Sequence, residues 1–414
     1  MEINTAIKGI SFKGLESYDV SSLVFYESEN DRIKGCSKSS FLRDFAQCFI
    51  SNKFSYARKK DSSKILFFTH ITHRKDIINS ISSLAVSSDG DFLRKITGHA
   101  VFPIFRGLTM VSLLLSWKKT LSVTGLTKGQ KQALLSRMIV FKQFDLFLDT
   151  INLQQYRLVV VSFDAHSLDR FLVHRCKKDQ IITATLQHGI VNAPIDINTW
   201  EYTGIELCSS ISDYFLAWNQ FTYDEAKKCN VDLNRIKIAG ILKCIELPVL
   251  SYKRGINNNI FGILLDNARG DLNNRKMIPI ANELAQVINF KYVIRFHPSY
   301  KGNEYDDLID FNFYQGQDKH ETLAEYAQSI EFTIQANSTT LIELIYMGYP
   351  VYKYTSNDKF DKCKDLTYNT FSNLEELLCF IQNNIDESSK MFELLCSVKD
   401  IRETYCSFFK TLIN

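Results

Sequence analysis

Short apolar runs alternate along the chain with segments whose apolar residues recur at helical spacing. Runs rich in β-branched and aromatic residues predict buried parallel strands, and the spacing between them predicts amphipathic helices. The strand-like runs are 64–69, 157–163, 181–186, 212–218, 235–239, 260–265, 292–296, 311–314, 331–334 and 350–354. The clearest helical segments are 167–177, 275–288, 322–328, 340–347 and 374–383. The alternation predicts an α/β protein with parallel sheets.

The length of 414 residues is too great for one ordinary core and predicts more than one domain. A polar, turn-rich segment at 253–259 interrupts the pattern and reads as a linker. We therefore expect two Rossmann-like domains, 1–250 and 251–414, whose parallel sheets face each other across a cleft. The last helix of the second domain is placed to cross back onto the first.

Amino-acid composition excludes fewer classes of function than the pattern of strands and helices does. A net charge of +3 gives no reason to expect a nucleic-acid partner. A basic cluster at Lys53, Arg58, Lys59 and Lys60 reads as a solvated loop, or as a contact with anionic lipid or glycan phosphate. The ten cysteines lack CxxC spacing, which indicates reduced thiols and a cytoplasmic protein. No signal-peptide pattern opens the sequence, and the apolar stretch at 107–117 is too short to span a bilayer, although peripheral contact with the inner membrane face stays open.

The run at 292–296 ends in a histidine and a proline, His297 and Pro298. Ligands of open α/β sheets bind at the carboxyl ends of strands, so His297 is placed to donate to a phosphate oxygen. Arg295 and His297 flank Phe296 and should point to the same face. The simpler alternative is a histidine that the backbone satisfies near the domain core.

A hydroxyl-rich helix start follows the run at 331–334. Asn337, Ser338, Thr339 and Thr340 precede or open the helix, and free N–H groups beside hydroxyls make a ready anion site. Thr340 and Glu343 have capping-box spacing, so Glu343 either caps this helix or holds the ribose of a nucleotide.

The run at 181–186 leads into Gln187, His188 and Gly189. The glycine permits a sharp turn and the close approach of a ligand. A neutral imidazole here can accept a proton from an attacking hydroxyl, or else is structural in a tight turn. Asp164, after the run at 157–163, could orient His188 or act as the base itself, and His166, His70 and His73 are weaker candidates. Gln187 and Gly189 are expected in the acceptor-side loop.

Other chemistries lack a signal in the sequence. No cysteine and histidine set has structural-zinc spacing, and no GxGxxG, GxxxxGK[ST] or GxSxG motif occurs. We therefore predict no metal and no cofactor beyond a nucleotide-sugar substrate. Arg269, in a loop after the run at 260–265, could meet a diphosphate.

These motifs resemble those of GT-B glycosyltransferases of bacterial capsule and lipopolysaccharide biosynthesis. The nearest groups are the Kdo and sialic-acid transferases and the teichoic-acid-type polyol-phosphate transferases, over about residues 155–360. In such families the His-Pro pair, here His297 and Pro298, and the later hydroxyl motif, here Ser338, Thr339 and Thr340, bind the donor. Sialyltransferases of this type carry an acidic pair where this chain has Gln187 and His188, whereas polyol-phosphate transferases have a His-Gly pair.

The resemblance implies a metal-independent inverting glycosyltransferase that moves a sugar from a CMP- or CDP-linked donor to a glycan or lipid-linked hydroxyl. His188, aided by Asp164, would take the proton of the acceptor. His297, the hydroxyl-rich helix start and Arg269 or Arg295 would stabilise the leaving phosphate. A polyol-phosphate transferase, a UDP-sugar 2-epimerase and a non-catalytic capsule-assembly protein remain alternatives.

Overall fold

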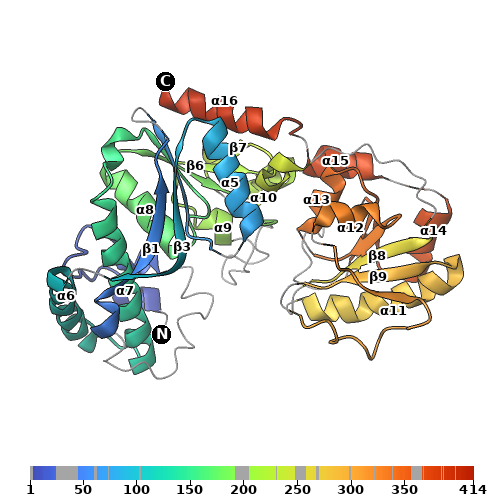
Figure 1. Ribbon diagram of the computed structural model, residues 1–414, viewed down its shortest axis with the longest axis horizontal. Helices are drawn as coiled ribbons and strands as arrows, with labels where there is room; N and C mark the ends of the chain where they lie inside the picture. Colours follow the sequence, from blue (N-terminus) through green and yellow to red (C-terminus); the bar gives the residue numbers. More distant parts are fainter. Residues whose placement is uncertain are drawn as a thin grey trace.

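A computed structural model folds the chain into two α/β domains side by side (Figure 1). It describes residues 3–24, 45–59, 63–72, 74–101, 104–191, 205–229, 231–247, 258–266, 270–297, 300–320, 322–337, 339–355, 366, 368–383, 385, 387–396 and 398–414. Three predicted site residues, Arg269, Pro298 and Ser338, lie outside these ranges.

The first domain is built on a sheet in the order β1-β3-β2-β4-β5-β6-β7. All neighbours run parallel except β1 and β3, which are antiparallel. The strands are β1 Ile50–Ala57, β2 Ile65–Thr69, β3 Asp91–Val101, β4 Leu158–Val161, β5 Ile182–Leu186, β6 Tyr214–Ala217 and β7 Ile236–Ile238. Strands β2, β4, β5, β6 and β7 were predicted, whereas β1 and β3 were not, because β1 is polar and half-exposed along its length.

Helices cover both faces of this sheet. In β2, Ile65 and Phe67 enter the core beside α5, whereas Leu66 and Phe68 enter the core beside α7 and α8, since consecutive residues of a strand point to opposite faces. The helices are α1 Ile3–Ile7, α2 Val20–Leu23, α5 Lys75–Ser87, α6 Ile104–Ser122, α7 Lys128–Leu148, α8 Ser167–Lys178, α9 Ile205–Cys208 and α10 Gln220–Lys228, with short 3-10 helices η1 Leu153–Gln155, η2 Leu233–Arg235 and η3 Leu242–Glu246.

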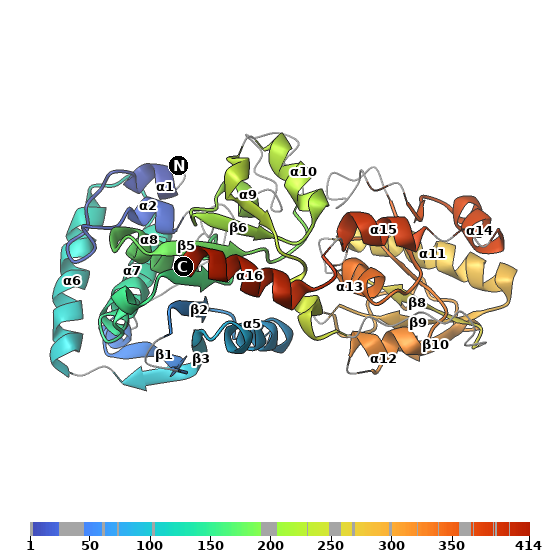
Figure 2. The same ribbon diagram turned by 90° about the horizontal axis from the view of Figure 1, so that it is seen from above.

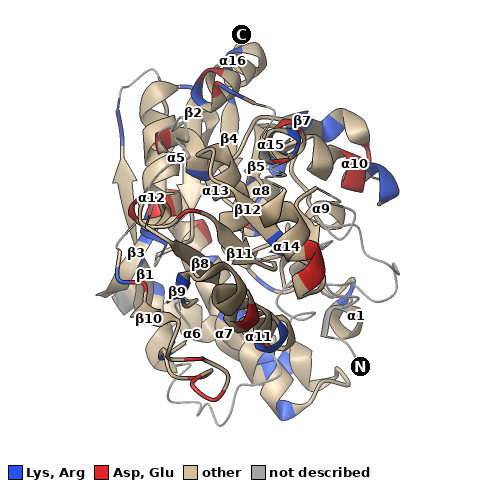
Figure 3. Cartoon of the chain, turned by 90° about the vertical axis from the view of Figure 1, so that its right-hand side faces the viewer, with Lys and Arg blue, Asp and Glu red and all other residues tan. Residues whose placement is uncertain are grey.

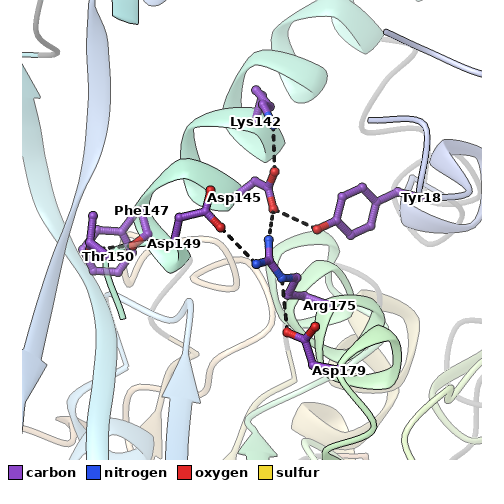
Figure 4. A network of polar contacts seen from close by, with 8 residues as sticks. All are labelled: Tyr18, Lys142, Asp145, Phe147, Asp149, Thr150, Arg175 and Asp179. Carbon is purple, nitrogen blue, oxygen red and sulfur yellow. Dashed lines mark hydrogen bonds and ion pairs between the residues drawn. The ribbon is translucent and has the colours of Figure 1, made fainter. Parts of the chain in front are cut away.

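The N-terminal segment is tied to α7 and α8 by a polar network (Figure 4). The Tyr18 hydroxyl donates to Asp145 at 2.8 Å, and Arg175 pairs with the same carboxylate at 2.7 Å and with Asp149 at 2.9 Å. Although burial opposes it, hydrogen bonds from Lys142 and Tyr18 hold the pKa of Asp145 below its usual value. The described N-terminal residues 3–24 are thus part of the first domain's packing.

The second domain has an entirely parallel sheet in the order β10-β9-β8-β11-β12-β13. Its strands are β8 Ile260–Leu264, β9 Lys291–Arg295, β10 Tyr314–Gln317, β11 Thr333–Gln335, β12 Val351–Tyr354 and β13 Thr370–Phe371. Its helices are α11 Asp271–Ile288, α12 Leu323–Gln328, α13 Thr340–Tyr346, α14 Leu374–Gln382 and α15 Ser388–Leu395.

The final helix, α16 Ile401–Ile413, lies on the first domain (Figures 1 and 2). Arg402 donates to Ser83 of α5 at 2.9 Å and pairs with Glu246 at 2.7 Å. The Tyr405 hydroxyl donates to the carbonyl of Gly240 at 3.1 Å. This helix therefore ties the C-terminus of the chain to the first sheet.

The two domains share one apolar core where they meet. Leu341, Leu344 and Ile345 of α13 belong to the same cluster as Ile77 of α5 and Leu242 of η3. Acidic and basic residues are interspersed over both domains (Figure 3), in keeping with the small net charge. None of the helices in the described ranges is long and apolar enough to cross a membrane.

Candidate active site

Charged side chains from both domains meet where the domains join. Arg74 precedes α5 and binds Asp76 through two hydrogen bonds, of 3.0 and 2.6 Å. Lys243 of η3 lies 3.1 Å from a carboxylate oxygen of Glu343 on α13 and 3.8 Å from Asp76. The side chains of Lys243 and Glu343 are only 9% and 16% exposed. A largely buried ion pair therefore joins the two domains.

His188 lies at the carboxyl end of β5, close to these charges. Its ring stacks on that of Phe163, with the centroids 5.2 Å apart. Burial, followed by the charges of Arg74 and Lys243, lowers the pKa of His188 to about 3. The imidazole is therefore neutral at physiological pH and free to accept a proton. So low a pKa also makes it a weak base until an anion offsets the two cations.

The residues beside His188 shape the turn. The Gln187 amide oxygen accepts from the backbone N–H of Trp218 at 2.6 Å, and its amide nitrogen donates to the carbonyl of Gly189 at 2.7 Å. The Trp218 indole N–H donates to the Gln187 carbonyl at 3.0 Å. Gln187 was predicted to lie in the acceptor-side loop; its side chain is buried and holds the turn that carries His188.

Asp164, the second predicted catalytic residue, is only 1% exposed. One of its oxygens, Oδ2, accepts hydrogen bonds from the Ser210 hydroxyl, the Ile211 N–H, and the N–H and hydroxyl of Ser212, at 2.7–2.9 Å. These contacts fix the loop before β6. No hydrogen bond joins Asp164 to His188 within the described residues, so we give Asp164 a structural role and leave it out of the reacting groups.

His297 follows β9, and its pKa is affected by the same arginine as that of His188. Burial lowers the pKa of His297, and Arg74 adds to that effect. Because Arg74 acts on both imidazoles, the carboxyl ends of β5 and β9 converge on one charge. Arg295 is engaged elsewhere: it pairs with Asp318, donates to the carbonyl of His320 at 3.2 Å, and is therefore not used in the donor site proposed below.

The start of α13 differs from the predicted cap. Thr339 precedes the first helical residue and makes no side-chain capping bond. The Thr340 hydroxyl donates to the side-chain oxygen of Gln335 at 2.9 Å. The expected capping pair of Thr340 and Glu343 is wrong, because Glu343 reaches across to Lys243 instead. The Glu343 carboxylate therefore lies at the domain junction, paired with Lys243, and does not cap α13.

Asn337 is held by its backbone. Its N–H donates to both carboxylate oxygens of Asp266, at 3.2 and 3.0 Å. Asp266 follows β8 and is only 6% exposed, so it anchors the loop that leads into α13. In the sequence analysis, Asp266 had no predicted role.

A second polar group lies along the carboxyl edge of the first sheet. His70 follows β2, and Asp169 is in the first turn of α8, beside His166. Their nitrogen and carboxylate donor atoms lie within 4.8 Å of one another, the one such group of metal-ligating side chains in the described part of the chain. His70 is also among the groups that act on His188.

Sequence reasoning missed Arg74, Asp76, Lys243 and Asp169. Arg74 carried a usable signal, because it closely follows the strand at 65–69 and precedes a helix. Lys243 carried none, since η3 is a short irregular segment without periodicity. The pairing of Lys243 with Glu343 spans 100 residues of sequence and appears only in the folded chain.

The comparisons with known proteins identify the fold. No known protein family and no curated sequence matches this chain significantly. Among solved structures, the chain is similar to the Methanocaldococcus jannaschii UDP-GlcNAc 2-epimerase in complex with UDP-GlcNAc and UDP (TM-score 0.52, 14% identity, 84% of this chain and 99% of that chain). It is also similar to a UDP-N-acetylglucosamine 2-epimerase (TM-score 0.55, 13% identity, 86% and 96%) and to the Neisseria meningitidis UDP-GlcNAc 2-epimerase bound to UDP-GlcNAc (TM-score 0.51, 12% identity, 84% and 99%).

The chain therefore has the predicted GT-B-like fold of two α/β domains with parallel sheets. Identities of 12–14% carry the fold and no more. The narrower resemblance to transferases with a His-Pro motif rests on the motifs alone.

Proposed function

We propose that this chain is an inverting glycosyltransferase. It moves a sugar from a nucleotide-activated donor, with CMP- or CDP-linked donors favoured, to a hydroxyl of a growing surface polysaccharide or lipid-linked glycan. The observation that carries the proposal is that Arg74 lowers the pKa of both His188 and His297, and Lys243, which lowers that of His188, pairs across the domain junction with Glu343. Cations and imidazoles at the carboxyl ends of facing parallel sheets suit a phosphate-bearing ligand.

The donor phosphate binds between Arg74, Lys243 and His297. An anion beside His297 raises the pKa of that imidazole, because an opposite charge favours the charged form. His297 thereby becomes a better hydrogen-bond donor as negative charge builds on the leaving phosphate. The same anion offsets the cations that act on His188.

Glu343 and Lys243 exchange partners when the donor enters. In the free protein they hold each other at 3.1 Å, which keeps both charges satisfied in a largely dry junction. A donor phosphate then pairs with Lys243, and Glu343 accepts hydrogen bonds from the ribose hydroxyls. This exchange makes donor binding sensitive to both residues.

A second candidate is a nucleotide-sugar 2-epimerase. It is favoured by the fold likeness to UDP-GlcNAc 2-epimerases, which extends over 84–86% of this chain. Both candidates use the phosphate site, because both act on a nucleotide-linked sugar. They differ in whether a hydroxyl acceptor is needed.

The test is a donor-turnover assay on the purified chain with CMP-, CDP-, UDP- and GDP-linked sugars, with and without a glycan acceptor. Acceptor-dependent release of the nucleotide is expected for the transferase. Turnover of a UDP-sugar without acceptor would instead establish the epimerase. Thermal shifts with CMP, CDP, UDP and GDP identify the nucleotide, because a ligand of the native state raises the melting temperature.

Variants test the phosphate site directly. Arg74→Ala and Lys243→Ala should each weaken nucleotide binding by about 10- to 100-fold, the usual loss for one charged hydrogen bond. Lys227→Ala is the matched control, since Lys227 is exposed and its described partners, Asp224 and the ring of Tyr223, lie on its own helix. Nucleotide affinity that is unchanged in both site variants would refute this binding site.

A further inference from the structure

His70 and Asp169 form a hydrogen-bonded dyad that the functional proposal above does not use. His70 leaves β2, Asp169 lies in the first turn of α8, and Nδ1 of His70 bonds the carboxylate oxygen Oδ2 of Asp169. Residues 99 positions apart in sequence are thus brought together at the carboxyl edge of the sheet. The dyad lies near His188, whose imidazole is affected by His70.

Asp169 is rigidly held. It is fully buried, and its other oxygen, Oδ1, accepts from the Ser162 hydroxyl at 2.8 Å and from the backbone N–H of Phe163 at 3.1 Å. Ser162 in turn accepts from the Thr69 hydroxyl at 3.1 Å. An acid in the first turn of a helix is further stabilised by the helix dipole. The carboxylate therefore has a fixed position and direction.

A buried carboxylate in this position fixes the tautomer of His70. An ionised carboxylate only accepts hydrogen bonds, so the proton of the neutral imidazole lies on Nδ1. Nε2, on the far side of the ring, then carries the free lone pair, and no described residue donates to it. The ring of His166 lies parallel to that of His70 with centroids 3.4 Å apart, which restricts rotation. The side chain of His70 is 15% exposed, so the ring is not sealed from a ligand.

Among the described residues, His188 has no carboxylate partner comparable to Asp169. Its ring stacks on Phe163, and no carboxylate bonds it among the described residues. Arg74 and Lys243, the cations that suit a donor phosphate, also oppose a positive charge on His188. A histidine that takes a proton needs a neighbour that stabilises the imidazolium, and Asp169 supplies this only to His70.

We infer that His70 is the proton acceptor of the reaction and that Asp169 is its positioning residue. The inference rests on the proposed glycosyl transfer. The acceptor hydroxyl gives its proton to Nε2 of His70 while its oxygen forms a bond to the anomeric carbon of the sugar. The bond from that carbon to the phosphate oxygen breaks, and its electron pair leaves with the nucleotide. The imidazolium of His70, paired with Asp169, then returns the proton to water.

His70, His166 and Asp169 could together bind a divalent cation instead. The geometry favours proton transfer by His70. Each nitrogen lone pair lies in the plane of its own ring, and the rings of His70 and His166 are nearly parallel with centroids 3.4 Å apart, so one ion cannot lie in both planes unless a ring rotates. A bound ion would also replace the hydrogen bond between His70 and Asp169. Metal content is therefore measured as part of the test.

The kinetic test compares His70→Ala, His70→Gln, Asp169→Asn and His188→Ala, with His99→Ala as an exposed control. We expect kcat to fall by about 100- to 10,000-fold in the His70 variants, the usual contribution of a general base, with nucleotide affinity unchanged. Asp169→Asn should lower kcat and move the acid limb of the pH profile, with KM unchanged. Full activity in His70→Gln, together with loss in His188→Ala, would overturn the inference.

The structural test needs no substrate. Long-range ¹H–¹⁵N spectra of the histidine rings, assigned through His70→Gln, should show His70 protonated at Nδ1 and shifted by Asp169→Asn. An Nε2-protonated His70, or one metal ion per chain that is lost in His166→Ala, would overturn the dyad. If nucleotides fail to bind while this tautomer is present, the functional proposal fails and the dyad stands.

Discussion

The ion pair between Lys243 and Glu343 allows a quantitative prediction about the domain junction. At 3.1 Å and an effective dielectric constant of about 20, the attraction between two unit charges is about 5 kcal/mol. Desolvation offsets much of this, because the side chains are only 9% and 16% exposed. Lys243→Met should therefore cost about 1–3 kcal/mol, mainly by leaving Glu343 without its cation. Glu343→Gln should cost no more than this, since Asp76 remains 3.8 Å from Lys243.

The assay is a double-mutant cycle by urea unfolding. The coupling energy should be about 1.5–3 kcal/mol, so the double variant should be much less destabilised than the sum of the single variants. The control is the exposed pair of Lys227 and Asp224, whose side chains are 52% and 44% exposed and whose coupling should stay below about 0.5 kcal/mol. A junction coupling no larger than that of the control would refute the reasoning. Saturating nucleotide should reduce the junction coupling, since the two residues then have other partners.

Three further predictions concern stability. Tyr18→Phe removes the hydroxyl that donates to the buried Asp145 and should cost about 1 kcal/mol by urea unfolding, whereas an unchanged midpoint would contradict the network. Burial, with Arg170, lowers the pKa of His174 from 6.5 to about 4. The neutral form of His174 therefore stabilises the fold above pH 6.5, and this stability is lost as the pH falls towards 4. His174→Gln should make the melting temperature fall less steeply over this range, and an unaltered slope would contradict the prediction. Gly262→Ala would place its Cβ 1.9 Å from the Tyr326 hydroxyl and should cost about 1–3 kcal/mol, a loss that Tyr326→Phe should partly restore if this clash is the cause.

The strands that carry the site could be predicted because their apolar runs are continuous. Strand β5 is buried along almost its whole length in a parallel sheet, which leaves a nearly unbroken apolar pattern in the sequence, whereas β9 buries Tyr292 and Ile294 on one face. The antiparallel edge pair of β1 and β3 could not be predicted in the same way, because an edge strand alternates polar and apolar residues weakly.

The candidate site was predictable only in part. His188 and His297 were found because each directly follows a predicted strand. The roles given to Arg295 and Glu343 depended on where their side chains go, and the fold sends them to Asp318 and Lys243. Spacing along one helix suggested a cap for Glu343, but a buried lysine from the other domain offered the stronger partner.

By itself, the sequence determined the alternation of strands and helices, the two sheets, and the placing of two histidines at strand ends. Hydrophobic periodicity records which face of each element is buried, and burial is a local property of the pattern. Only the tertiary structure decided that Arg74 acts on both histidines, that Lys243 meets Glu343, and that Asp169 holds His70. The pairs Lys243–Glu343 and His70–Asp169 join residues about 100 positions apart, and periodicity carries no information about which distant partner a polar side chain will find.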